Sequence, residues 1–357
     1  MPEIPDQDRS DELRAAVREA IADGAPLAVG GGGTKAFYGN PVAARPLTVS
    51  GHCGIVNYAP TELVVTVRAG TPLAALEARL AAHGQQLGFE PPHFGAAATV
   101  GGMVAAGLSG PPRPWAGAVR DAVLGAEVLT GTGEVLRFGG EVMKNVAGYD
   151  VSRVMTGSLG TLGILLSVSL KVVPRPAAEA TRVLAMDEAE ALAALAEWGR
   201  RPLPLAGTLH QDGRLHVRLA GNAGAVTEAG ERLGGEAVAA AEAPWADLRE
   251  QRLGFFRGDG PLWRLSLPPA APPLALPGET LTEWGGALRW VRTPLPPAEV
   301  QAAAANAGGH ATCFRGGNRA EPAFPPPARP VLALHRKLKQ ALDPHGLFNP
   351  GRMYDGL

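Results

Sequence analysis

Four consecutive glycines near the start of the chain constrain its fold more than any other feature. Residues 30–33 follow the apolar segment 27–29 and precede Thr34 and Lys35. Glycine weakens strand and helix interiors, so such a run marks a turn with positive φ or a close approach of backbone to a ligand. Successive N–H groups can hold an anion, for which phosphate is the natural guest. A flexible surface loop is the alternative that the run alone leaves open.

Two common glycine motifs do not match this segment. A mononucleotide P-loop needs Ser or Thr directly after its lysine, but Ala36 follows Lys35. The nicotinamide fingerprint needs glycine where Lys35 stands. The remaining hypothesis is a pyrophosphate held by glycine amides and by Lys35, without an obligatory metal.

Length, charge and cysteine content narrow the class of protein. The chain has 357 residues, enough for two domains at roughly 150 residues each. Its formal charge of -1 gives no sign of a nucleic-acid partner. Its two cysteines, Cys53 and Cys313, are too few for a disulfide framework or for the four thiolates of an iron–sulfur cluster. The longest uncharged stretch, residues 94–112, is rich in glycine, so we expect loops there and no transmembrane segment.

Helix and strand patterns alternate over the first half of the chain. Ser10 is expected to cap an opening helix, and Thr71 with Pro72 to begin a second one. Residues 122–129 and 134–138 predict a hairpin, and residues 164–173 alternate like a strand with one face on a core.

The pattern changes after Pro174, Arg175 and Pro176. From there to about residue 320 we infer a second α+β domain, in which Asp187 and Glu190 resemble a capping box. Further segments read as strands, at 215–219, 262–267, 288–291 and 311–314. A proline-rich linker then precedes a terminal helix at 331–342.

The glycine-dense segments occur in an order that resembles the FAD-binding domain of the vanillyl-alcohol oxidase family, the PCMH-type fold. The motifs that carry this resemblance lie at residues 30–35, 61–67, 99–102, 121–125 and 157–164. Within the family, the chain most resembles the E subunits of bacterial glycolate oxidases. That likeness is carried by residues 144–150 (K-N-V-A-G-Y-D), 309–312 (G-H-A-T) and 343–352 (D-P-H-G-L-F-N-P-G-R).

The resemblance implies an α+β fold with three parts. A two-subdomain PCMH-type FAD-binding domain would span residues 1–176, and a smaller α+β cap domain would span 177–320. A proline-rich linker and C-terminal helical segment, 321–357, would return to the FAD domain.

The resemblance also implies which residues bind FAD. The first glycine loop would cradle the pyrophosphate, the second would run beside the ribityl chain and flavin ring, and the third would line the far side. No histidine lies between residues 24 and 51, so we expect non-covalent FAD. The expected FAD-binding residues are Gly30, Gly31, Gly32, Gly33, Thr34, Lys35, Pro92, Thr99, Val100, Gly101, Gly102, Gly107, Ser109, Asp121, Gly157, Gly160, Gly163 and Ile164.

Oxidation of a small 2-hydroxy acid needs a cation for the carboxylate and a base for the hydroxyl proton. Our candidates are Arg264, Arg289, Arg315 and His310. Arginine suits the carboxylate because its planar guanidinium can bind both oxygens. Ordinary surface arginine is the alternative for each. His93 is a further candidate, with loop stabilisation as its alternative role.

His210 and His216 occupy the place where catalytic relatives carry a metal-binding H-x-G-D-G-N-x-H motif. The core of that motif is broken here, so we expect a turn between two strands and no metal. The broken motif is also an argument against oxidation of the substrate by this chain alone.

The resemblance predicts a cytoplasmic FAD-binding subunit of a glycolate oxidase complex. Its partners would be a catalytic FAD subunit and an iron–sulfur subunit, through which it could lie peripheral to a membrane. A self-sufficient FAD-dependent hydroxy-acid or alcohol oxidoreductase is one alternative. A non-catalytic assembly subunit that retains the fold without flavin is another.

Overall fold

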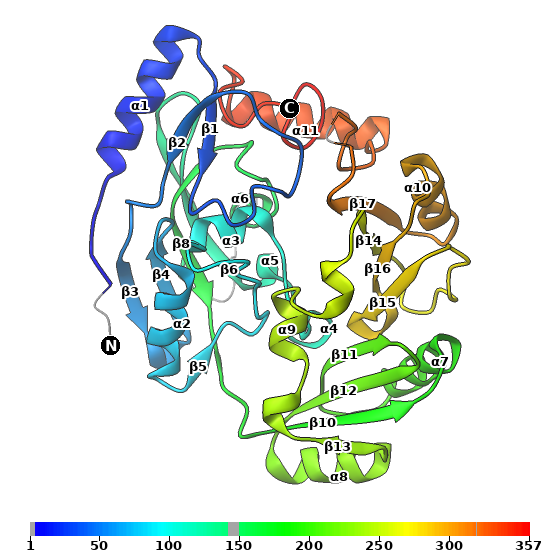
Figure 1. Ribbon diagram of the computed structural model, residues 1–357. Coiled ribbons are helices and arrows are strands. Elements are labelled where there is room, and N and C mark those ends of the chain that lie inside the picture. The colour runs from blue at the N-terminus through cyan, green and yellow to red at the C-terminus, as the bar shows by residue number, and fades with distance from the viewer. Residues whose placement is uncertain (1–3, 142–149, 319) are drawn as a thin grey trace. The chain divides into compact units, whose positions relative to one another are not determined.

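The computed structural model describes residues 4–141, 150–318 and 320–357. The chain divides into two compact units, which Figure 1 colours along the sequence. The first unit is built from the chain up to Ser109, from Ala118–Pro174 and from Pro326–Leu357, and the second from Gly110–Gly117 and Arg175–Pro325. Of the motif at 144–150, residues 144–149 lie outside the described residues.

The first unit contains a five-stranded antiparallel sheet in the order β3-β4-β8-β6-β7 and a parallel pair, β1-β2. A short pair, β5-β9, completes its strands among the described residues. The strands are β1 (Leu27–Gly30), β2 (Arg45–Thr48), β3 (Ile55–Ala59), β4 (Val64–Arg68), β5 (Gln85–Gln86), β6 (Val123–Leu129), β7 (Val135–Gly139), β8 (Ile164–Lys171) and β9 (Val173–Pro174). The helices are α1 (Ser10–Asp23), α2 (Leu73–Ala81), α3 (Val100–Ala106), α5 (Val119–Ala122), α6 (Val151–Val154) and α11 (Arg329–Leu342), with a 3-10 turn at Pro60–Glu62.

The alternation in β8 fixes which face of this sheet covers the core. Leu166, Val168 and Leu170 are at most 1% exposed and pack with apolar side chains of α2 and α3. Ser167 and Ser169 lie on the other face, where Ser169 contacts Thr66 of β4. The predicted hairpin is confirmed as β6 and β7, which pair antiparallel.

Two sequence expectations for helix starts in this unit were wrong. Ser10 is the first residue of α1 and not its cap, and Pro72 occupies the N-cap position of α2. The loop-rich stretch 94–112 also contains the short helix α3. The Thr99 hydroxyl accepts a hydrogen bond from the Gly102 N–H and so starts α3, and Gly107 ends it in the left-handed conformation that glycine adopts without strain. The N-cap at Thr99 was not predicted from the sequence, because Gly101 and Gly102 in the first turn of α3 have low helix propensity.

The second unit is built on one eight-stranded antiparallel sheet, in the order β13-β10-β12-β11-β15-β16-β14-β17. Its strands are β10 (Ala178–Ala185), β11 (Leu205–Gln211), β12 (Arg214–Gly221), β13 (Glu236–Val238), β14 (Leu262–Ser266), β15 (Glu279–Glu283), β16 (Leu288–Arg292) and β17 (His310–Arg315). The helices are α4 (Arg113–Ala116), α7 (Glu188–Trp198), α8 (Ala223–Leu233), α9 (Trp245–Arg249) and α10 (Pro297–Asn306), with 3-10 turns at Ala240–Glu242, Gly254–Arg257 and Trp284–Gly286.

Helices cover one face of each half of this sheet. Side chains of α7 and α8 pack on β11 and β12, and those of α10 pack on β14, β16 and β17. The capping box predicted at Asp187 and Glu190 is confirmed at the start of α7. In the parts of the chain that the structure describes, no helix is long and apolar enough to span a bilayer.

Candidate functional site

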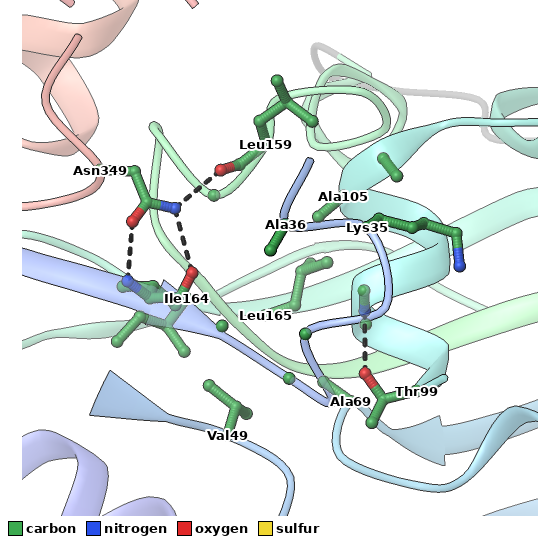
Figure 2. Close-up of a pocket in the computed structure, with 18 of the residues that line it drawn as sticks. Lys35, Ala36, Val49, Ala69, Thr99, Ala105, Leu159, Ile164, Leu165 and Asn349 are labelled. Carbon is green, nitrogen blue, oxygen red and sulfur yellow. Dashed lines mark hydrogen bonds between the residues drawn. The ribbon is translucent and has the colours of Figure 1, made fainter. Parts of the chain in front are cut away.

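A cavity of about 300 Å³ lies within the first unit. Its walls come from the glycine run after β1, the first turns of α3, the loop that leads into β8, and two residues near the C-terminus (Figure 2). These segments are far apart in the sequence. The three glycine-dense segments therefore share one cavity, of a size at the lower end of the range for small-molecule sites.

Twelve of the eighteen expected FAD-binding residues line this cavity. They are Gly30, Gly31, Gly32, Gly33, Thr34, Lys35, Thr99, Gly101, Gly102, Gly160, Gly163 and Ile164. The sequence expectation did not include several further wall residues, among them Val42, Val49, Ala69, Ala105, Asn349 and Arg352.

The other six expected residues do not line the cavity. Val100 and Pro92 are buried, and Gly107 packs closely on Gly157 at the end of α3. The Ser109 hydroxyl accepts from the Val119 N–H, and the Asp121 carboxylate accepts from the Ala118 N–H.

The glycine run presents backbone donors to the cavity. Within the described residues, the N–H groups of Gly31, Gly32, Gly33 and Thr34 donate no hydrogen bond. By contrast, the first amides of α3 are all used, since Val100 donates to Thr71 O, Gly101 to Ala69 O and Gly102 to the Thr99 hydroxyl. The donors for an anion therefore lie in the glycine run, and α3 contributes a wall of small side chains.

Three of the four glycines are required by the protein itself, for two different reasons. A Cβ on Gly31 would overlap the Thr99 hydroxyl, and a Cβ on Gly32 would overlap the Ala97 carbonyl. A Cβ on Gly30 or Gly33 would meet no protein atom within 4 Å, although Gly33 has a positive φ of 71°. Gly31 and Gly32 thus allow the loop to pack closely on Thr99 and Ala97, while Gly30 borders open space. Such a bare cradle with unused amides fits a diphosphate.

The cation beside the glycine run is held by a neighbouring loop. Lys35 Nζ donates to the His93 carbonyl at 3.1 Å and lies 5.6 Å from the centroid of the Phe94 ring. The His93 ring in turn contacts the Glu77 carboxylate at 2.9 Å. Both of these His93 contacts are therefore with neighbouring protein groups, an arrangement that suits a loop-stabilising role.

The C-terminal segment holds the cavity walls together. Asn349, at a positive φ of 42°, bonds to Val29 and to the Leu159 carbonyl, as the dashed lines in Figure 2 show. The Arg352 guanidinium donates to the carbonyls of Ala36, Tyr38 and Asn40, which follow the glycine run. Both residues belong to the motif at 343–352, which carried the resemblance without indicating these roles.

The four substrate candidates of the second unit lie in different surroundings. Arg264 on β14 and His310 on β17 share one face of the sheet, because Arg264 pairs with Thr312 and Ser266 pairs with His310. Arg289 is 2% exposed on the other face, and its guanidinium donates to the carbonyls of Ala271, Pro272 and Gly286. Arg315, near the far end of β17, has its pKa lowered by burial and by Arg292.

His210 and His216 lie on adjacent strands. They flank the turn between β11 and β12, as the sequence predicted. His210 contacts the Met186 carbonyl at 3.0 Å, and burial lowers the pKa of His216. Across residues 4–141, 150–318 and 320–357, no group of three or more His, Cys, Asp or Glu side chains is arranged to hold a metal ion.

Comparison with known proteins defines the class first. Residues 8–139 match the family model of the FAD binding domain. Among solved structures, an alkyldihydroxyacetonephosphate synthase has a TM-score of 0.65 over 97% of this chain and 76% of its own, at 16% identity. That identity is low, so the match concerns the fold. The fold is therefore that of a PCMH-type FAD-binding protein.

Sequence relatives narrow the class further. The chain is 52% identical over 347 residues to glycolate oxidase subunit GlcE of Escherichia coli, which covers 97% of this chain and 98% of that protein. It is also 38% identical over 95 residues to glycolate oxidase subunit GlcD of Bacillus subtilis, which covers 27% of this chain and 20% of that one. The chain belongs to the family of glycolate oxidase subunit GlcE.

Proposed function

We propose that this chain is the FAD-binding subunit of a glycolate oxidase complex. It would take part in the flavin-dependent oxidation of glycolate to glyoxylate and pass electrons to partner subunits. The observation that carries the proposal is the set of unused amide donors at 31–34, exposed to a cavity that two other glycine-dense segments also line. The relationship to a glycolate oxidase subunit over nearly the whole chain supports it.

The residues of the first unit suggest how FAD would be held. The amides of Gly31, Gly32, Gly33 and Thr34 would bind the diphosphate, and the Lys35 ammonium would add positive potential nearby. The small residues of α3 and the loop at 158–163 would allow a flat ring system to approach the backbone closely. When bound, FAD would supply an acceptor for two electrons. We propose that attachment is non-covalent, because no histidine is among the described residues that line the cavity.

The proposal also includes two partner subunits. GlcD of Bacillus subtilis is also named as a glycolate oxidase subunit, which supports a second flavoprotein subunit as a partner. An iron–sulfur subunit is proposed because the two cysteines of this chain cannot supply four thiolate ligands. A cytoplasmic location, with attachment to a membrane through the partners, belongs to the same proposal.

A visible spectrum of the purified chain tests this function. We expect the purified chain to show flavin absorbance and to release its flavin on denaturation. We expect anaerobic glycolate to bleach this absorbance only after the partner subunits are added. Bleaching of the isolated chain would instead support a self-sufficient oxidoreductase. A colourless chain that cannot be loaded with FAD but still binds the partners would support an assembly subunit.

A further inference from the structure

Arg264 of the second unit packs on the ring of Trp284 and forms no ion pair with a carboxylate of the described chain. The guanidinium carbon of Arg264 lies 5.1 Å from the centroid of the Trp284 ring, whose N–H donates to the Gly110 carbonyl at 3.0 Å. Within the described chain, Arg264 forms no ion pair or hydrogen bond through its guanidinium. The Arg113 guanidinium lies 4.5 Å from the same ring centroid. A half-buried cation on an aromatic platform without a counter-ion is a receptor for an anion.

A buried carboxyl group accompanies this arginine on the same sheet face. Glu283 is 5% exposed, and its Oε1 accepts from the Trp290 ring N–H at 2.5 Å. Trp290 pairs directly with Arg264 across β14 and β16, and with Leu281 across β15 and β16. Directly opposed residues, and residues two apart in a strand, share a face, so Glu283 lies on the face of Arg264. The two groups are not within salt-bridge distance.

The remaining groups of this face are compatible with a small ligand. Thr312 lies directly opposite Arg264, and His310 lies two residues before it on β17. The other face of these strands is filled by Trp263, Leu265 and Ala311 against α10. Arg289 lies on the opposite face of the sheet. Glu188 accepts a hydrogen bond from Thr282 on that opposite face. The Arg264 face thus carries Thr312 and His310 beside Arg264, while the rings of Phe256 and Phe314 pack on Trp290 of the neighbouring strand.

We propose that this face binds a small monocarboxylate on the Arg264 guanidinium, and that binding is accompanied by proton uptake at Glu283. The chemical class of the ligand rests on the proposed function, since glycolate is a small monocarboxylate. An anion placed on Arg264 would add negative charge beside an ionised Glu283, so the site holds the anion best with Glu283 neutral.

The direction of the pH dependence follows from the groups that face Glu283. Burial raises the pKa of Glu283 to about 7, against the opposing effects of the Trp290 hydrogen bond and of Arg264. The pKa of His310 is lowered by burial and by Arg264, so His310 is neutral above pH 7. A bound anion raises the pKa of Glu283 further, so affinity falls as pH rises through 7.

Calorimetric titration of the full chain with acetate tests this inference. Acetate carries the carboxylate but no hydroxyl, so it leaves the flavin oxidised. We expect the affinity to fall by about tenfold from pH 6 to pH 8. Arg264→Gln should weaken binding by about tenfold or more, while Arg264→Lys retains part of it. Arg232→Gln, an exposed site on α8, is the matched control and should bind like the parent. Glu283→Gln should bind with similar affinity at both pH values.

Two results would overturn the inference. One is acetate affinity in Arg264→Gln equal to that of the control, in a variant whose circular dichroism matches the parent. The other is a pH dependence that persists in Glu283→Gln. The flavin spectrum of each sample reports on the proposed function separately, because it depends on the cavity of the first unit and not on acetate.

Discussion

Asn349 and Val29 are 320 residues apart in the sequence and bond to each other in both directions. The Val29 N–H donates to Asn349 Oδ1 at 2.7 Å, and Asn349 Nδ2 donates to the Val29 carbonyl at 3.1 Å. The same amide also donates to the Leu159 carbonyl at 2.8 Å. Since Val29 directly precedes the glycine run, the side chain of Asn349 fixes the position of that run relative to the loop at 157–163.

We expect Asn349→Ala to destabilise the first unit by about 2 kcal/mol, because it leaves partly buried backbone groups of Val29 and Leu159 without partners. FAD content should fall as well, since the two glycine segments lose their common anchor. Thermal unfolding and the flavin-to-protein absorbance ratio measure the two effects. Asn57→Ala, at an exposed side chain that contacts Glu141, is the control and should change neither. Equal behaviour of the two variants would contradict this role for Asn349.

The buried ion pair of Lys339 and Asp343 gives a second prediction. Lys339 Nζ donates to Asp343 Oδ2 at 2.7 Å and to the carbonyls of Thr161 and Phe348. Lys339→Met leaves the buried carboxylate without its cation, and we expect a loss of about 3–5 kcal/mol in unfolding free energy. Urea denaturation measures it, with Lys337→Met at an exposed position of α11 as the control. A loss below 1 kcal/mol would show that Asp343 relaxes toward water.

A third prediction separates the ligand from the loop at the glycine run. Gly30→Val adds a side chain where no protein atom lies within 4 Å of the new Cβ, so unfolding of the flavin-free chain should be unchanged. If FAD occupies this space, its affinity should fall by about tenfold or more through steric overlap. Fluorescence titration of the flavin-free chain with FAD measures the affinity. Gly254→Val, also at an open position, is the control. Unchanged FAD affinity in Gly30→Val would place the cofactor elsewhere.

The pKa of Glu283 gives a prediction for stability. Folding raises the pKa of this carboxyl from 4.5 to about 7 through burial, so the folded chain binds its proton more tightly. The group's contribution to stability is therefore greatest below pH 4.5 and declines as pH rises to about 7, by about 3 kcal/mol in all.

Glu283→Gln removes this titration while keeping an acceptor for the Trp290 N–H. We expect the variant to gain stability relative to the parent between pH 5 and pH 8, as measured by urea denaturation at both values. Glu279→Gln, at the exposed start of the same strand, should show no such pH-dependent gain. The same difference between parent and Glu283→Gln at both pH values would contradict the raised pKa.

Local sequence patterns were sufficient for much of the fold. The alternation in residues 164–171 set the buried face of β8, and the Asp187–Glu190 pair marked the start of α7. The glycine segments indicated which parts of the backbone line the cavity, because only glycine tolerates such close approach. The segment after Thr99 was predicted as a loop because its glycines have low helix propensity, whereas Gly101 is required inside α3 because a Cβ there would overlap Ala69.

The sequence by itself determined where bare backbone would occur and which strands have one apolar face, since both depend on residues close together in the chain. Only the tertiary structure decided that Asn349 and Arg352 hold the glycine run, and that Arg264 and Arg289 lie on opposite faces of one sheet. Those relationships depend on strand register and on contacts between distant segments. A side chain acquires its partners from long-range packing, and residue type alone does not specify that packing.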